Sequence, residues 1–129
     1  MKKPTIVIAE DDYVIREGCL RPMLESEFEV VAAVGDGQAA LAAAEEHKPD
    51  VILLDVSLPV VRGFDAARNV LSSQPGIKVL FVSNYAQKAY VDEAVRMGAS
   101  GYVLKSQVAS QLALAIKTAL SGHFYSGIA

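Results

Sequence analysis

Five polar residues lie at the ends of short apolar runs of the chain. Asp11 and Asp12 come shortly after the first run, and Asp55, Ser83 and Lys105 directly follow three later ones. Carboxylates are the preferred ligands of hard cations such as Mg²⁺. A hydroxyl and an ammonium group can bind the oxygens of a phosphoryl group. The residue types therefore predict metal-assisted phosphoryl chemistry, with Asp55 as the nucleophile that forms an aspartyl phosphate.

Charge repulsion supports a cation at this place. Two carboxylates about 5 Å apart repel by roughly 3 kcal/mol at an effective dielectric constant near 20. Lys105 offsets part of the repulsion, and three carboxylates still leave surplus negative charge. A divalent cation would remove the surplus, and Mg²⁺ fits oxygen ligands best, with Mn²⁺ as the alternative ion. Glu10 precedes the two aspartates and has no expected role in the chemistry.

The polar residues can meet only if the apolar runs form one parallel sheet. Short β-branched runs alternate along the chain with longer stretches of helical spacing or high alanine content. Pro22 lies inside the first helical stretch, where it predicts a kink or an early end. The predicted strands are 5–9, 28–34, 51–54, 78–82 and 101–104, and the predicted helices are 14–25, 38–47, 64–73, 86–97 and 108–121.

This alternation predicts an α/β fold with a doubly wound, five-stranded parallel sheet in the order 2-1-3-4-5 and helices on both faces. The strands are nearly continuously apolar, which indicates burial on both sides. Ligands of such sheets bind beyond the carboxyl ends of the strands, where the strand order reverses. The three aspartates converge at that point, and Ser83 and Lys105 flank it.

Composition limits the class of protein. A chain of 129 residues with 52% hydrophobic and 21% charged residues predicts one folded domain. The net charge of −3 gives no sign of a nucleic-acid surface, and the single cysteine, Cys19, fits a reducing compartment. No apolar run has the length of a signal peptide or a membrane span, so the expected location is the cytoplasm, without membrane contact.

The pattern as a whole resembles the receiver domain of bacterial two-component response regulators. The resemblance rests on EDD at 10–12, DVSLP at 55–59, Gly63, Ser83 and GASGYVLK at 98–105. It implies that the chain catalyses only its own phosphorylation and dephosphorylation, with a phosphohistidine of a sensor histidine kinase as donor. The implied roles are Asp55 as phosphoacceptor, Asp11, Asp12, Asp55 and the Ser57 carbonyl as Mg²⁺ ligands, Ser83 as switch hydroxyl, Tyr102 as switch aromatic that turns inward, and Lys105 as phosphate-binding lysine.

Two positions depart from the usual family pattern. Asn84 stands where a small residue is usual, and Ser57 stands where a larger residue is often found. The resemblance implies that Ser57, Asn84 and Tyr85 border the phosphoryl group and tune its lifetime. These departures bear on the rates of gain and loss of phosphate and leave the chemistry unchanged.

Simpler structural roles stand beside these assignments. Asp12 could cap the first helix, a role that is compatible with metal binding. Lys105 and Ser83 would each be unremarkable alone, and Tyr102 could be a static core residue. The two histidines have no partners at metal-ligand spacing, and His47 has an ordinary explanation in the dipole at a helix end.

Other function classes fit the residues less well. A phosphatase of the haloacid-dehalogenase type needs an acid two residues after its nucleophile, where this chain has Ser57. A flavin binder needs a phosphate loop after the first strand, and the EDDY sequence there repels phosphate. A pseudo-receiver that keeps the fold without phosphorylation has Asn84 as its only support.

The expected domain organisation is a receiver at 1–122, followed by a tail or the start of a linker at 123–129. The closing stretch resembles receivers of NarL/FixJ-type transcription regulators, which implies DNA contact only through a helix-turn-helix domain outside this chain. The alternative is a stand-alone receiver that relays phosphate or docks on a partner. One arc of the last helix is a candidate homodimer face, formed by Ser110, Gln111, Leu114, Lys117, Thr118 and Ser121.

Overall fold

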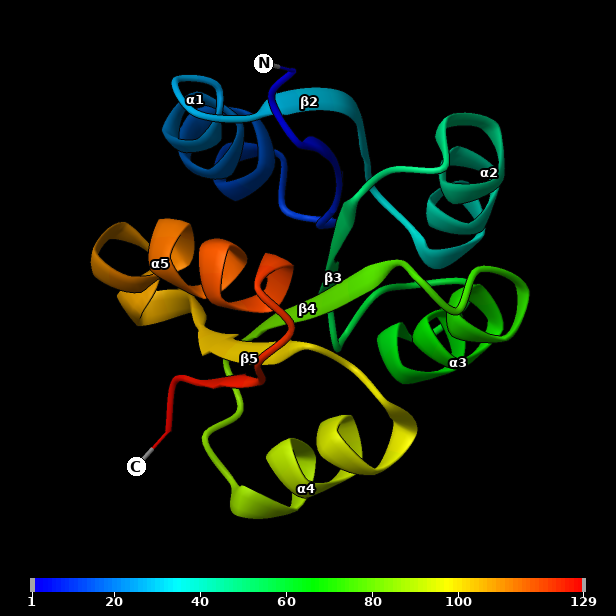
Figure 1. Cartoon of the computed structure of the whole chain (residues 1–129), viewed down its shortest axis with the longest axis vertical. Coiled ribbons are helices and arrows are strands. Elements are labelled where there is room, and N and C mark those ends of the chain that lie inside the picture. The colour runs from blue at the N-terminus through cyan, green and yellow to red at the C-terminus, as the bar shows by residue number, and fades with distance from the viewer. Residues whose placement is uncertain (1, 129) are drawn as a thin grey trace.

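A central parallel sheet organises the chain in the computed structural model, which describes residues 2–128 (Figure 1). Its six strands lie in the order β2-β1-β3-β4-β5-β6, and every neighbouring pair is parallel. The predicted order of the first five strands is therefore confirmed. The strands are β1 (Thr5–Ala9), β2 (Glu29–Val34), β3 (Val51–Asp55), β4 (Lys78–Ser83), β5 (Gly101–Leu104) and β6 (Tyr125–Ser126).

Helices cover both faces of the sheet (Figure 1). The first and last helices pack on one face in a cluster that contains Leu20, Leu24, Leu112 and Ile116. Three helices pack on the other face, where their alanines and Val70 lie against the strands. The helical segments are η1 (Val14–Leu20), α1 (Arg21–Leu24), α2 (Gly37–His47), α3 (Gly63–Ser73), α4 (Lys88–Met97), the short turn η2 (Lys105–Gln107) and α5 (Val108–Leu120).

Burial on both faces explains why the strands read as continuous apolar runs. All five residues of β3 are buried, and so are Ile6–Ala9 of β1. Side chains of a strand alternate between the two faces, so both clusters draw on the same strands. Among residues 2–128, no helix is both long and apolar enough to cross a bilayer.

The first helix differs from the predicted continuous stretch at 14–25. Its first part is a π-helix, in which the Arg21 N–H donates to the Arg16 carbonyl five residues earlier. Pro22 follows at the second position of α1 and has no N–H for the usual bond to Gly18. The helical run nevertheless continues through Pro22 to Leu24, so the helix does not end at the proline, and the change from π-helix to α-helix falls just before it.

The segment predicted as a tail or linker contains a sixth strand. β6 pairs with β5 through bonds from Tyr125 N–H to the Ser100 carbonyl and from Gly127 N–H to the Tyr102 carbonyl. A Cβ on Gly127 would lie 2.9 Å from that Tyr102 oxygen, so glycine allows the close approach. The two-residue strand is too short to give a periodic sequence signal.

The loop after β3 is tightly held and locally strained. The Pro59 carbonyl accepts from Gly37 N–H and from Val61 N–H, and the second bond closes a three-residue turn around Val60. Val60 has a φ of 69° and is 80% exposed. A positive φ is costly for a β-branched residue. At the far end of the loop, a Cβ on Gly63 would lie 2.2 Å from the Asp55 carbonyl oxygen, so only glycine fits there.

Candidate functional site

The carboxyl ends of four neighbouring strands carry the polar residues that the sequence analysis selected. Strand register places Asp55 beside Val82, so Ser83 lies one residue further along the neighbouring strand. Ser83 pairs with Leu104, and Lys105 follows directly. Because all strands are parallel, these residues reach the same edge of the sheet as the end of β1. Asp55, Ser83 and Lys105 therefore lie at the edge that includes the switch point between β1 and β3.

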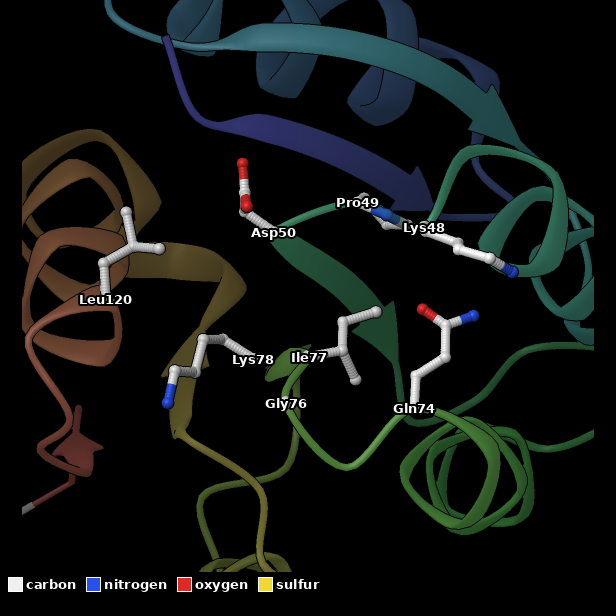
Figure 2. A pocket seen from close by; sticks show the side chains of 8 residues that line it. All are labelled: Lys48, Pro49, Asp50, Gln74, Gly76, Ile77, Lys78 and Leu120. Atoms are coloured by element: carbon white, nitrogen blue, oxygen red, sulfur yellow. The ribbon is translucent and has the colours of Figure 1, made fainter. Parts of the chain in front are cut away.

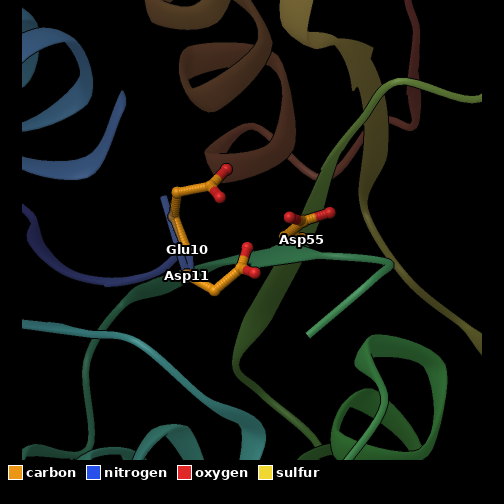
Figure 3. A group of neighbouring side chains, drawn as sticks. All are labelled: Glu10, Asp11 and Asp55. Atoms are coloured by element: carbon orange, nitrogen blue, oxygen red, sulfur yellow. The ribbon is translucent and has the colours of Figure 1, made fainter. Parts of the chain in front are cut away.

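Three carboxylates gather at this edge (Figure 3). Glu10, Asp11 and Asp55 each offer one oxygen, and these oxygens lie within 4.8 Å of one another. Glu10 and Asp55 are buried, whereas Asp11 is exposed. The Lys105 ammonium lies 2.8 Å from Asp55 Oδ2 and 2.8 Å from Glu10 Oε1. One cation therefore bridges two buried anions, and the third anion stands at the solvent side.

The protonation equilibria reflect this arrangement. Burial raises the pKa of Glu10 because it disfavours the charged form, and the hydrogen bonds from Lys105 and from the Asp12 N–H only partly offset it. Burial works against the Lys105 ammonium, but its contacts with Asp55 and Glu10 outweigh that effect and raise the pKa of Lys105. The ammonium therefore stays charged at neutral pH, and Glu10 is the carboxyl that binds a proton more readily than usual.

The structure places Glu10 in the acidic group instead of Asp12. The Asp12 carboxylate accepts from Ile15 N–H at 3.1 Å, and its carbonyl accepts from Arg16 N–H, so Asp12 caps the first helix. Glu10 continues the strand by one residue, since its N–H donates to the Val34 carbonyl, and its side chain stays inside. The expected set of Asp11, Asp12 and Asp55 is thus Glu10, Asp11 and Asp55 in the fold.

Asp55 is oriented by contacts on both of its oxygens. Oδ1 accepts from Ser57 N–H at 3.0 Å, and Oδ2 accepts from Lys105 Nζ. A carboxylate has about four lone-pair sites, so both oxygens keep room for a further partner. The side chain is almost fully buried, yet it stays anchored at the sheet edge where the other polar groups lie.

Tyr85 connects the remaining predicted residues. Its N–H donates to Ser83 Oγ at 3.0 Å, and its carbonyl accepts from the Tyr102 hydroxyl at 2.7 Å. Its own hydroxyl lies 3.3 Å from Ser57 Oγ. Ser83 is fully buried, while Asn84 points away from the core and is exposed. Sequence reasoning named Tyr85 only as a neighbour of the phosphoryl position, and its contacts place it at the centre of the group.

The Tyr102 ring is already turned inward. The side chain is 0% exposed, and its hydroxyl donates to the backbone of the loop that precedes α4. Burial raises the pKa of this phenol. Tyr102 was expected to move inward upon switching, and in this structure the inward position is the one that it holds.

The donor set suits a hard divalent cation. All three groups are carboxylates, the ligand type that Mg²⁺ takes in proteins. Glu10 Oε1 is buried, and the Lys105 ammonium at 2.8 Å is its one polar partner. Two buried carboxylates thus share a single ammonium, and three carboxylates with one ammonium leave a net charge of −2, which fits a cation at this edge.

A separate hollow opens at the opposite edge of the sheet (Figure 2). It has a volume of about 350 Å³ and lies among the loops that precede β3 and β4. The acidic group is absent from its lining, so the hollow is distinct from the site described above. Its walls are Lys48, Pro49, Asp50, Gln74, Gly76, Ile77, Lys78 and Leu120.

The candidate dimer face on α5 is partly exposed. Leu114 is 58% exposed, while Gln111 and Thr118 are half-buried. Lys117 pairs with Glu27 at 3.0 Å within the chain. Association through this face stays a prediction.

Comparison with known proteins gives one consistent family. The family model described as the response regulator receiver domain matches residues 6–117. The transcriptional regulatory protein DegU of Brevibacillus brevis is 41% identical over 124 residues, which cover 95% of this chain and 52% of that protein. The oxygen regulatory protein NreC of Staphylococcus haemolyticus is 38% identical over 93% of this chain and 56% of its own length. The chain thus spans about half the length of the curated relatives that it matches.

Solved structures agree with this result. The receiver domain of the response regulator NarL from Mycobacterium tuberculosis is 32% identical, with a TM-score of 0.87, over 95% of this chain and 100% of that one. A DNA-binding response regulator of the LuxR family from Staphylococcus aureus is 27% identical, with a TM-score of 0.83, over 91% and 98% of the two chains.

Proposed function

Because this chain belongs to the response regulator receiver domain family, we propose that Asp55 is its phosphoacceptor and that Glu10, Asp11 and Asp55 hold the Mg²⁺ ion that the reaction needs. Receiver domains of two-component systems interact with histidine kinases, so the proposed donor is a phosphohistidine. The observation that carries the proposal is the position of Asp55, a buried carboxylate bonded to Lys105 and grouped with two further carboxylates at the sheet edge.

In the proposed transfer, a carboxylate oxygen of Asp55 attacks phosphorus in line with the bond to the donor nitrogen. A new O–P bond forms, the P–N bond breaks, and the imidazole keeps the electron pair of that bond and takes up a proton. Lys105, already bonded to Asp55 Oδ2, binds a phosphoryl oxygen and balances its charge. Ser83 offers its hydroxyl to a second oxygen.

The proposed metal ligands are Glu10, Asp11, Asp55 and the Ser57 backbone carbonyl. Mg²⁺ bound there supplies charge neutralisation for the phosphoryl oxygens. Asp12 is left out of this set because its oxygens are not among those that gather at the sheet edge and one of them accepts from the Ile15 N–H at the start of the first helix. Mn²⁺, which takes the same oxygen ligands, is the proposed substitute.

We further propose that the output of the switch is transcription. The supporting fact is that curated relatives such as DegU are transcriptional regulatory proteins and that this chain matches about half of their length. DNA contact is proposed for a further domain, because the net charge of this chain is −3.

The experiment that tests Asp55 is incubation with Mg²⁺ and acetyl phosphate, followed by intact mass measurement. The wild-type chain is expected to gain one phosphoryl group, and Asp55→Asn is expected to gain none. A matched control is Asp50→Asn, which removes a carboxylate at the opposite edge of the sheet and should label normally. No added mass on the wild type, or equal labelling of Asp55→Asn, would contradict the proposal.

A further inference from the structure

A chain of aromatic rings runs from the mouth of the site into the helices beside it. The Tyr85 ring stacks on Tyr90 at 5.0 Å between centroids and 15° between planes, and Tyr90 stacks on Phe64 at 6.0 Å and 15°. Phe64 meets Phe81 edge to face at 4.9 Å, and Phe81 lies 6.3 Å from Tyr102. The rings therefore connect the loop after β4, α4, α3 and the core, and they return to Tyr102.

Tyr85 needs support for its position. Its side chain is 39% exposed, and its hydroxyl makes one long contact of 3.3 Å, with Ser57 Oγ. Its backbone is fixed by Ser83 and Tyr102, but neither bond restrains the ring. A half-exposed tyrosine with a single weak hydroxyl contact has other rotamers available. The parallel stack on Tyr90 is the contact that selects the observed one.

The selected position places the phenol across the ends of β3 and β4. Ser57 follows the phosphoacceptor by two residues, and its N–H is bonded to Asp55 Oδ1. The phenol therefore contacts the residue whose backbone N–H holds the carboxylate. We propose that Tyr90 is a positioning residue for the aspartyl phosphate, because it holds the Tyr85 ring at the mouth of the site and slows the entry of hydrolytic water.

This inference rests on the proposed phosphorylation of Asp55 and concerns the loss of the phosphoryl group. In that step a water oxygen attacks phosphorus, the bond between phosphorus and the Asp55 oxygen breaks, and the carboxylate leaves with the electron pair. Inorganic phosphate carries away both water protons. The protein slows the step by limiting water access, and Tyr90 acts only through Tyr85.

The location of Tyr90 makes its ring sensitive to α4. The helix has one buried residue, Ala94, so its hold on the sheet is light. The helix is tied to α3 by the ion pair between Arg68 and Glu93 and by the partly buried Phe64–Tyr90 stack. A partner that shifts α4 would therefore change the lifetime of the phosphoryl group.

The test compares Tyr90→Leu, Tyr90→Phe and the wild type after labelling with acetyl phosphate and removal of the donor. Loss of the stack between Tyr85 and Tyr90, worth about 0.5–1.5 kcal/mol, corresponds to a roughly two- to tenfold change in the population of the observed Tyr85 ring position. Tyr90→Leu is therefore expected to lose phosphate about two- to tenfold faster, and Tyr90→Phe to match the wild type. Val95→Ala, on an exposed position of the same helix, is the control and should change nothing.

A double variant separates positioning from a general structural effect. Tyr85→Leu should also shorten the lifetime, and adding Tyr90→Leu to it should shorten the lifetime no further. An unchanged lifetime in Tyr90→Leu, or an equal further loss in the double variant, would overturn the role of Tyr90. A wild type that takes no phosphoryl mass would instead overturn the proposed function.

Discussion

Lys105 bridges two buried carboxylates, so its charge should be needed for stability. The ammonium lies 2.8 Å from both Glu10 and Asp55, whose side chains are 1% and 4% exposed. Each contact corresponds to about 6 kcal/mol of Coulomb energy at an effective dielectric constant of 20, most of which offsets desolvation. Removal of one partner from such a buried pair costs about 3–5 kcal/mol. Lys105→Met should lower the free energy of unfolding by about that amount in the presence of EDTA.

The deficit should depend on pH in a definite direction. Without the ammonium, Glu10 and Asp55 oppose each other at 4.8 Å or less. That repulsion is at least about 3.5 kcal/mol at a dielectric constant of 20, and it disfavours the state in which both carboxyls are charged. The pKa of Glu10, which burial already raises, therefore rises further in the folded variant, and the folded state binds more protons than the unfolded state. Stability of Lys105→Met should thus fall as pH rises from about 5 to about 7, relative to the wild type.

Urea unfolding followed by far-UV circular dichroism measures this deficit, at about pH 5.5 and about pH 8. The matched control is Lys117→Met, which breaks the exposed pair with Glu27 and should cost less than about 1 kcal/mol. Addition of Mg²⁺ should recover part of the stability of Lys105→Met, because the ion replaces the lost positive charge. The electrostatic reasoning is refuted if Lys105→Met is as stable as the wild type near pH 8 in EDTA, or if its deficit is the same at both pH values.

Two further substitutions test local features of the site. Val60→Gly should raise the free energy of unfolding by about 0.5–1 kcal/mol. Val60 holds a positive φ that costs an L-residue roughly 1–2 kcal/mol, and glycine loses part of this gain through its flexible unfolded state. Val60→Ala should raise the free energy of unfolding by less, and chemical denaturation that finds Val60→Ala the more stable of the two would contradict this explanation. Asp12→Ala should lower stability by about 1 kcal/mol through loss of the helix cap, and it should leave the Mg²⁺ affinity in calorimetric titration unchanged. Asp11→Ala should weaken Mg²⁺ binding without lowering metal-free stability. The reverse pattern would restore Asp12 as the metal ligand.

The alternation of apolar strands and helical stretches was enough to predict a parallel sheet covered on both faces, because burial on both faces leaves a strong signal. The order 2-1-3-4-5 followed from the doubly wound arrangement that five such units favour. It was also enough to bring Asp55, Ser83 and Lys105 to one edge, since parallel strands end together. The sequence could not decide among three adjacent acids. That choice depends on where β1 ends and the first helix begins, and such boundaries are the weakest part of sequence reasoning.

The useful signal for Asp12 was its place two residues before the helical stretch that begins at Val14. A capping aspartate directs its carboxylate at the helix N–H groups, and so away from the sheet edge. The sequence also could not predict strand β6 or the stack of Tyr85 on Tyr90. The strand is two residues long, and the stack joins side chains whose relative placement depends on the position of α4.

The strand order also governs how the chain can assemble. β1 lies between β2 and β3, and every pair of neighbouring strands in the described sheet is parallel. Strands that are consecutive in the chain therefore cannot pair as a β-hairpin. Each pairing must wait until an intervening helical segment has crossed the sheet, and loop closure then precedes most of the energetic gain. Folding of this chain therefore depends on long-range closure more than on local propensity, which places it on the slow side of single-domain proteins. A ribosome must release β3 before β1 has both of its neighbours, so the carboxylates of Glu10 and Asp55 come together only after more than a third of the chain has been made.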